Sequence, residues 1–114
     1  MKTYKRLPNH FSVDGFFKNH DSLLWNGDAL KLLNKLPEKF FIDLVITSPP
    51  YNIGKSYEKH STLDQYFANQ KLIIEAIDLR VKNGGSICWQ VGNHITKNGI
   101  YPLDYGFHEI FTKL

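Results

Sequence analysis

The chain of 114 residues contains one cysteine, Cys88, and its five histidines show no metal-ligand spacing. A single cysteine excludes an intrachain disulfide and a cysteine cluster for zinc or iron–sulfur, so no metal is expected. No segment approaches the roughly 20 apolar residues of a membrane-spanning helix, and the basic N-terminus lacks the apolar stretch of a signal peptide. These absences predict a cytoplasmic protein with no membrane partner.

Charge of one sign is also sparse, because no run of five or six like charges occurs. The formal charge of +3 therefore permits a polyanionic partner without identifying one. Hydrophobic residues make up 42% of the chain and aromatic residues 14%, which is enough for a packed core and argues against disorder. The length predicts at most one domain.

The hydrophobic pattern predicts alternating strands and helices after an irregular N-terminal arm at residues 1–20. We expect strands at 22–26, 41–47 and 86–91, helices at 29–36 and 63–81, and a final helix that opens at Pro102. The apolar run 41–47 is typical of a strand that is covered on both faces. Strands that alternate with helices predict right-handed crossovers and a parallel sheet, an α/β architecture, over residues 21–114.

The end of the chain leaves an apolar surface without a predicted cover. The final helix carries an apolar face, and no later element follows it: Phe107, Ile110, Phe111 and Leu114. A parallel sheet of three strands is also a poor stand-alone domain. We therefore expect the sheet to be incomplete.

Chemistry is concentrated in residues 48–51, Ser-Pro-Pro-Tyr, which we call the proline hook. Two successive prolines fix φ near −65° and end the preceding strand abruptly. Ligands of open α/β sheets lie beyond the carboxyl ends of the strands. A rigid polar hook beside an aromatic ring suits a flat heterocycle with an amino group, because Ser48 and a backbone carbonyl can accept the amine protons while Tyr51 stacks on the ring.

The segment Thr47-Ser48-Pro49-Pro50-Tyr51 resembles the catalytic motif of DNA methyltransferases that modify exocyclic amines. Three further features of the family agree: the apolar strand before the motif, the Lys-Asn-Gly-Gly turn about 35 residues later, and Gly27-Asp28 upstream. The resemblance covers roughly residues 21–114. It implies a partial Rossmann-like methyltransferase sheet, S-adenosylmethionine as cofactor and double-stranded DNA as partner.

The resemblance also implies the roles of individual residues. Ser48, Pro49, Pro50 and Tyr51 would hold a base flipped out of the duplex, which costs a few kcal/mol of unstacking. The methyl group would then pass directly to nitrogen without a covalent enzyme intermediate. Cys88 is therefore not needed as a nucleophile, and we interpret it as a core residue.

Asp28 resembles the acidic residue that accepts a hydrogen bond from the cofactor's adenine. An aspartate after glycine at a helix start is also a good N-cap, so both interpretations stay open. Trp89 lies at the end of the last strand and either lines the cleft or belongs to the core. Asp43 precedes most of the apolar run and is expected to be solvated or capping.

The family's glycine-rich turn, which binds the methionine end of the cofactor, is absent from the sequence. The order matches the permuted subgroup, in which the catalytic half comes first and the cofactor-binding half follows the target-recognition region. We therefore expect this chain to be the N-terminal part only, with an unpaired first strand. It should be completed by a missing C-terminal half or by self-association.

Three functional hypotheses follow. The first is the catalytic part of a DNA methyltransferase of a restriction-modification system, inactive without its other half, with adenine N-6 slightly favoured over cytosine N-4. The second is a truncated, inactive remnant with at most weak nucleic-acid binding. The third is an RNA or protein-glutamine methyltransferase, against which the serine of the motif and the missing upstream glycine turn both count. The sequence does not reveal the recognition sequence.

Overall fold

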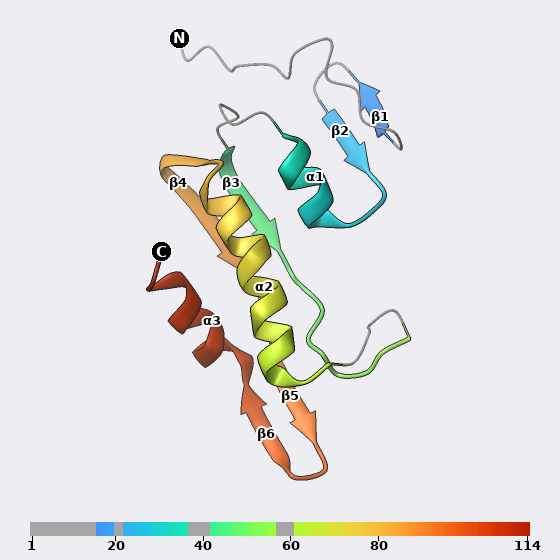
Figure 1. Ribbon diagram of the computed structural model, residues 1–114, viewed down its shortest axis with the longest axis vertical. Coiled ribbons are helices and arrows are strands. Elements are labelled where there is room, and N and C mark those ends of the chain that lie inside the picture. The colour runs from blue at the N-terminus through green and yellow to red at the C-terminus, as the bar shows by residue number, and fades with distance from the viewer. Residues whose placement is uncertain (1–15, 20–21, 37–41, 57–60) are drawn as a thin grey trace.

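The computed structural model describes residues 16–19, 22–36, 42–56 and 61–114. Most of the predicted N-terminal arm, residues 1–15, lies outside the described residues. Figure 1 shows the arrangement of the described elements. In chain order they are β1 (Phe16–Asn19), β2 (Ser22–Trp25), α1 (Ala29–Lys35), β3 (Ile42–Thr47), α2 (Leu63–Asp78), β4 (Val81–Trp89), β5 (Asn93–Thr96), β6 (Gly99–Pro102) and α3 (Leu103–Phe111).

The centre of the fold is a parallel pair of strands, β3 and β4, joined by α2. The pairing runs from Ile42 opposite Val81 to Thr47 opposite Trp89. This unit confirms the predicted α/β class with a parallel sheet and flanking helices. Helix α2 ends earlier than predicted because β4 already begins at Val81. The glycines of the expected turn lie inside β4, where the register shifts and Gly84 has a φ of +81°.

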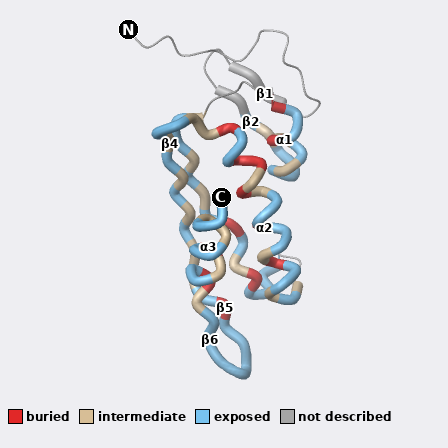
Figure 2. The backbone as a smooth tube through the Cα atoms, turned by 60° about the vertical axis from the view of Figure 1, so that its left-hand side comes forward, coloured by how far each residue is buried: buried red, intermediate tan, exposed pale blue. Residues whose placement is uncertain are grey.

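Helix α2 lies at the centre of the core, and α1 and α3 pack against it. The buried stretches, red in Figure 2, follow α2 and its neighbours. One apolar cluster lies between α1 and α2 and contains Leu33, Leu36, Ala76 and Ile77. A second lies between α2 and α3 and contains Tyr66, Ile74, Leu103 and Phe107.

The prediction that the final helix leaves its apolar face uncovered is wrong for most of that face. Phe107 is 3% exposed and Leu103 is fully buried. The rings of Phe107 and Phe111 also contact the indole of Trp89, with centroid distances of 5.7 and 5.8 Å. Helix α2 and the end of β4 therefore cover this face, and Leu114 stays 51% exposed.

Two antiparallel hairpins were not predicted. The first pairs β2 with β1, so the expectation of an unpaired first strand is wrong: residues 16–19, assigned to the irregular arm, supply the partner locally. The second pairs β5 with β6 across a turn that ends in Asn98-Gly99. The hydroxyl of Thr96 accepts from the Asn98 amide at 3.2 Å, and Gly99 has a φ of +146°.

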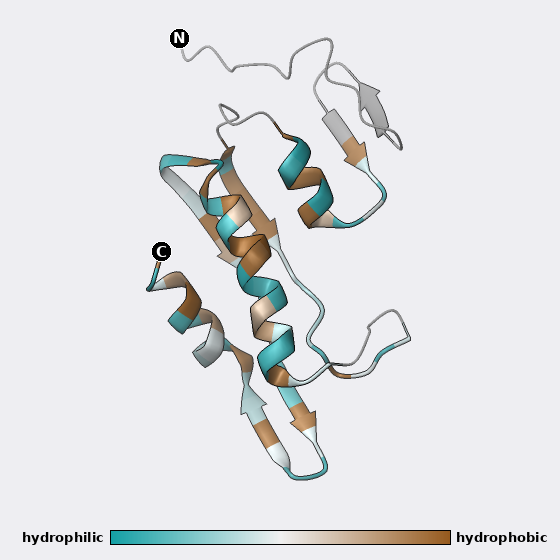
Figure 3. Cartoon of the chain, viewed as in Figure 1, coloured by the Kyte–Doolittle hydropathy of each residue, from teal (hydrophilic) through white to brown (hydrophobic). Residues whose placement is uncertain are grey.

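The second face of the β3–β4 pair is open to solvent, so the expectation that β3 is covered on both faces is wrong here. Val45 and Ile87 point to the helices, whereas Leu44 and Ile46 are 51% and 75% exposed. Figure 3 shows β3 as a largely hydrophobic strand. Cys88 is exposed as well, which corrects its assignment to the core. We call this surface the open sheet face. Among the described helices, none is long and apolar enough to cross a membrane.

Candidate active site

The proline hook begins where the parallel pair ends. The Gln90 amide donates to the Thr47 carbonyl at 2.9 Å, and Ser48 follows immediately. Ser48 and Pro50 are exposed, Pro49 is buried and Tyr51 is half-buried. The hook therefore stands at the carboxyl end of the sheet with its polar groups accessible, the usual place of a ligand site in this class of fold.

Two hydrogen bonds from side-chain hydroxyls stabilise the hook. The Ser48 and Tyr51 hydroxyls lie 2.9 Å apart and form a hydrogen bond, in which either oxygen can donate. Tyr66 of α2 donates from its hydroxyl to the Pro50 carbonyl at 2.7 Å. The side chain of Tyr66 is 6% exposed and belongs to the second apolar cluster. The core thus fixes the position of the second proline.

Asn52 connects the hook to the start of α2. Its backbone has a φ of +57°, a conformation that asparagine tolerates better than most residues, and its side chain is 2% exposed. The side-chain nitrogen of Asn52, Nδ2, donates to the backbone carbonyl of Ser61 at 2.7 Å. The side-chain oxygen, Oδ1, accepts from the backbone amide of Ser61 at 3.0 Å. Thr62, the next residue, is the N-cap of α2.

Gly92 lets the ring of Tyr51 approach the chain that leaves β4. A Cβ at Gly92 would lie 3.1 Å from Tyr51 Cε2 and 3.2 Å from Cδ2. Sequence reasoning included Asn52 in the active-site segment without its contact to Ser61, and it missed Tyr66 and Gly92, because each acts through a contact distant in sequence. The signal that was present is weak: Asn52 directly follows the motif, where a positive φ permits the chain to turn away.

A hollow of about 450 Å³ lies beside Ser48. It opens at the carboxyl end of β3 and β4 and is lined by Ile46, Thr47, Ser48, Cys88, Trp89 and Gln90. Trp89 thus contributes to the hollow and to the aromatic packing under α3, so both sequence interpretations of Trp89 hold. The arrangement places an open hollow, lined by apolar and polar side chains, next to the Ser48 hydroxyl.

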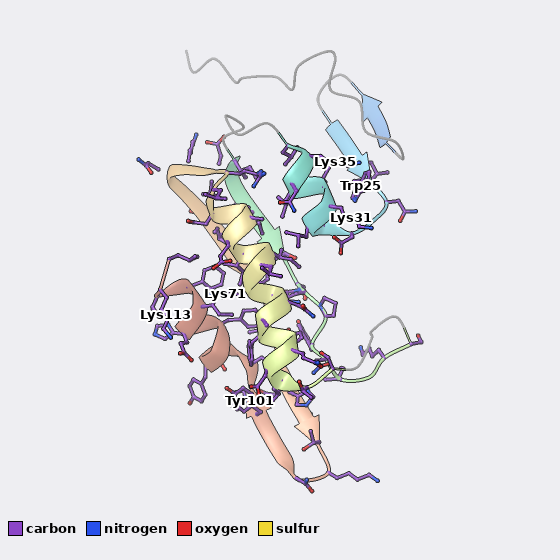
Figure 4. All side chains as sticks on the ribbon, in the orientation of Figure 1. Trp25, Lys31, Lys35, Lys71, Tyr101 and Lys113 are labelled. Carbon is purple, nitrogen blue, oxygen red and sulfur yellow. The ribbon has the colours of Figure 1, made fainter. Side chains whose placement is uncertain are left out.

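Asp28 is the N-cap of α1. Its Oδ1 accepts from the Lys31 amide at 2.9 Å, and its carbonyl accepts from Trp25 Nε1 at 3.1 Å. Figure 4 shows Trp25, Lys31 and Lys35 in this part of the molecule, where Lys35 Nζ lies 5.8 Å from the centre of the Trp25 ring. The capping interpretation is therefore observed, and the cofactor role stays a prediction.

The structure does not place Asp28 and the proline hook in one sheet. Asp28 follows β2, which pairs with β1, whereas the hook follows β3, which pairs with β4. Asp43 is exposed and forms an ion pair with Lys82, as expected for a solvated group. Within the described ranges, no three His, Cys, Asp or Glu side chains gather as a metal site would require.

An α/β unit that ends in an accessible Ser-Pro-Pro-Tyr hook defines a methyltransferase-like class. A family model described as DNA methylase matches residues 42–112, the range from β3 to α3. The chain belongs to this DNA methylase family. No solved structure matches the chain.

Curated relatives agree with the family. The chain is 41% identical over 109 residues to "Type II methyltransferase M.BglII" of Bacillus subtilis, covering 95% of this chain and 30% of that protein. It is 36% identical over 77 residues to "Type II methyltransferase M.ScaI" of Streptomyces caespitosus, covering 68% and 25%. A shorter match, 43% over 42 residues, covers 37% of this chain and 14% of "DNA adenine methyltransferase YhdJ" of Escherichia coli K12. The chain thus spans less than a third of these relatives.

Proposed function

We propose that residues 21–114 form the N-terminal, catalytic part of a site-specific DNA methyltransferase. It transfers a methyl group from S-adenosylmethionine to the exocyclic amine of an adenine or cytosine that is flipped out of duplex DNA. The observation that carries this proposal is the proline hook itself. It presents an exposed serine hydroxyl and an aromatic ring at the carboxyl end of a parallel strand pair, next to a hollow of about 450 Å³.

The hook would hold the amine through two acceptors. Ser48 Oγ accepts one amine proton. The second acceptor is a backbone carbonyl of the hook, and we favour those of Ser48 and Pro49 because the carbonyls of Thr47 and Pro50 each already accept one hydrogen bond, from Gln90 and Tyr66. Held in this way, the nitrogen keeps its lone pair free, and Tyr51 supplies a stacking surface worth about 1–3 kcal/mol.

S-adenosylmethionine supplies an electrophilic methyl group on sulfur when it is bound. In this chain Asp28 would accept a hydrogen bond from its adenine amine. The observed N-cap geometry is compatible with this role, because capping uses Oδ1 and a carboxylate has a second oxygen. The sequence carries no glycine-rich turn for the methionine end. We therefore assign that turn to a C-terminal half, without which the chain is inactive.

The context of the enzyme follows from its relatives. Two relatives are named as Type II methyltransferases, which supports a modification enzyme of a restriction-modification system. We propose that it acts in the cytoplasm. The relative named as a DNA adenine methyltransferase supports our slight preference for adenine N-6 over cytosine N-4. Double-stranded DNA is the proposed partner, with no metal in the reaction.

The test uses the chain extended at its C-terminus by a half that carries the glycine-rich turn, which we call the completed enzyme. It measures methyl transfer to DNA in a single turnover. Ser48→Ala should slow transfer roughly tenfold or more, since an unpaired hydrogen-bonding partner costs about 1–3 kcal/mol. Tyr51→Ala should also slow it. Cys88→Ala should leave the chemical step largely intact although Cys88 lines the hollow, because direct transfer to nitrogen needs no thiolate. If Cys88→Ala abolished transfer while Ser48→Ala and Tyr51→Ala stayed near the unmutated rate, the mechanism would be refuted. No transfer by the unmutated completed enzyme would favour an inactive remnant.

A further inference from the structure

We propose that the phenol hydroxyl of Tyr51 is a positioning group that orients the hydroxyl of Ser48 as a hydrogen-bond acceptor for the target amine. This role is additional to the stacking of the Tyr51 ring. The inference rests on the proposed methyltransferase function and identifies the group that lets the Ser48 hydroxyl act as an acceptor in it. The observation behind it is the 2.9 Å hydrogen bond between Ser48 Oγ and Tyr51 Oη.

A serine needs such a device because its hydroxyl rotates. It carries one proton and two lone pairs, so it can present either a donor or an acceptor to a ligand. An amine that must keep its own lone pair free requires an acceptor. If the Ser48 proton pointed at the amine, it would bind that lone pair and block the reaction. The hydroxyl must therefore be turned so that its proton lies elsewhere.

Tyr51 Oη is the hydrogen-bonding partner of Ser48 Oγ in the structure. When the amine donates to Oγ, the Ser48 proton is donated to Tyr51 Oη. In the alternative sense Tyr51 donates to Oγ, and the Ser48 proton is left beside the one remaining lone pair, so only the first sense orients the acceptor toward the amine. In both senses the contact fixes the position of Oγ.

The Tyr51 ring is itself fixed, so it can serve as a reference point for Ser48. Its edge lies against Gly92, where an added Cβ would approach Cε2 to 3.1 Å. The ring is half-buried and packs on the second apolar cluster. The rigid Pro49–Pro50 pair separates the two hydroxyls in the chain, and Tyr66 holds the Pro50 carbonyl. Ser48 is exposed and lacks comparable packing.

The test is Tyr51→Phe, which keeps the ring and removes Oη. In the completed enzyme we expect the single-turnover rate of methyl transfer to fall roughly tenfold, as for loss of one hydrogen bond to a polar partner. Base stacking, followed by the fluorescence of 2-aminopurine at the target position, should stay at the wild-type level. Tyr51→Ala should lose both. Tyr105→Phe, which removes a phenol hydroxyl from the exposed face of α3, is the matched control and should change neither.

A second background separates orientation of Ser48 from a general effect. Ser48→Asp and Ser48→Asn carry acceptor oxygens that need no hydroxyl to be turned. In either background, Tyr51→Phe should slow transfer less than twofold. A wild-type rate for Tyr51→Phe, or the same tenfold loss in all backgrounds, would overturn the inference. If the unmutated enzyme neither methylated DNA nor gave a 2-aminopurine signal, the proposed function itself would fail.

Discussion

Tyr66→Phe tests whether the core positions the proline hook. The change removes the hydroxyl that donates to the Pro50 carbonyl at 2.7 Å and keeps the ring. The edge-to-face contacts of that ring with Phe67 and Phe107, at 5.3 and 6.0 Å, should persist. A net hydrogen bond contributes about 0.5–1.5 kcal/mol to the free energy of unfolding. Pro50 is exposed, so water can replace the lost donor, and we expect a loss of about 1 kcal/mol.

If the hydrogen bond from Tyr66 holds the hook in its reactive geometry, its loss should also raise the activation free energy of methyl transfer by a similar amount. A loss of about 1 kcal/mol of positioning corresponds to roughly fivefold slower transfer in the completed enzyme. Urea denaturation would measure the stability, and single-turnover methylation the rate. Tyr66→Ala is the upper reference, because removing a buried aromatic ring costs about 3–5 kcal/mol. An unchanged rate in Tyr66→Phe, despite reduced stability, would refute a positioning role for Tyr66.

Three other results are expected. Calorimetric titration of the chain alone should give a Kd for S-adenosylmethionine weaker than micromolar, and a micromolar value would contradict the assigned role of the C-terminal half. The chain should self-associate through the open sheet face. In analytical ultracentrifugation Ile46→Thr should reduce this association, whereas Ile100→Thr on β6, where Ile100 is 65% exposed against 75% for Ile46, should not. Gly106→Ala should lower the free energy of unfolding by about 1–3 kcal/mol, because its Cβ would lie 2.2 Å from the ring of Phe67. A stabilised Gly106→Ala variant would show that helix propensity outweighs this clash.

Local patterns in the sequence predicted the elements that position the hook. The apolar run before Ser48 forms β3, and the spacing of apolar residues from Leu63 onward forms α2. Asp28 and Pro102 stand at the starts of α1 and α3, as their capping and helix-opening preferences predict. These features depend on residues close in sequence, so a single chain contains enough information to find them.

The errors arose where a contact joins distant residues or where two patterns compete. The glycines at 84 and 85 indicated a turn, yet they lie within β4, at an irregularity where the register with β3 shifts between Val81 and Ser86. The Asn98-Gly99 pair is a strong hairpin signal that was interpreted as a loop. Cys88 and Ile46 look like core residues by type, and only the placement of all three helices on the other face shows that they are exposed.

The hydrogen bonds between Asn52 and Ser61 have a consequence for how this protein can vary. They join Asn52 to Ser61, the two residues that flank the segment between them. A change in the length of that segment would leave these two hydrogen bonds in place. Each doubling of the length of a flexible loop adds only about 0.6 kcal/mol to the entropic cost of closing it. The hook and the start of α2 would keep their geometry. The hook is thereby insulated from changes in chain length between Asn52 and Ser61.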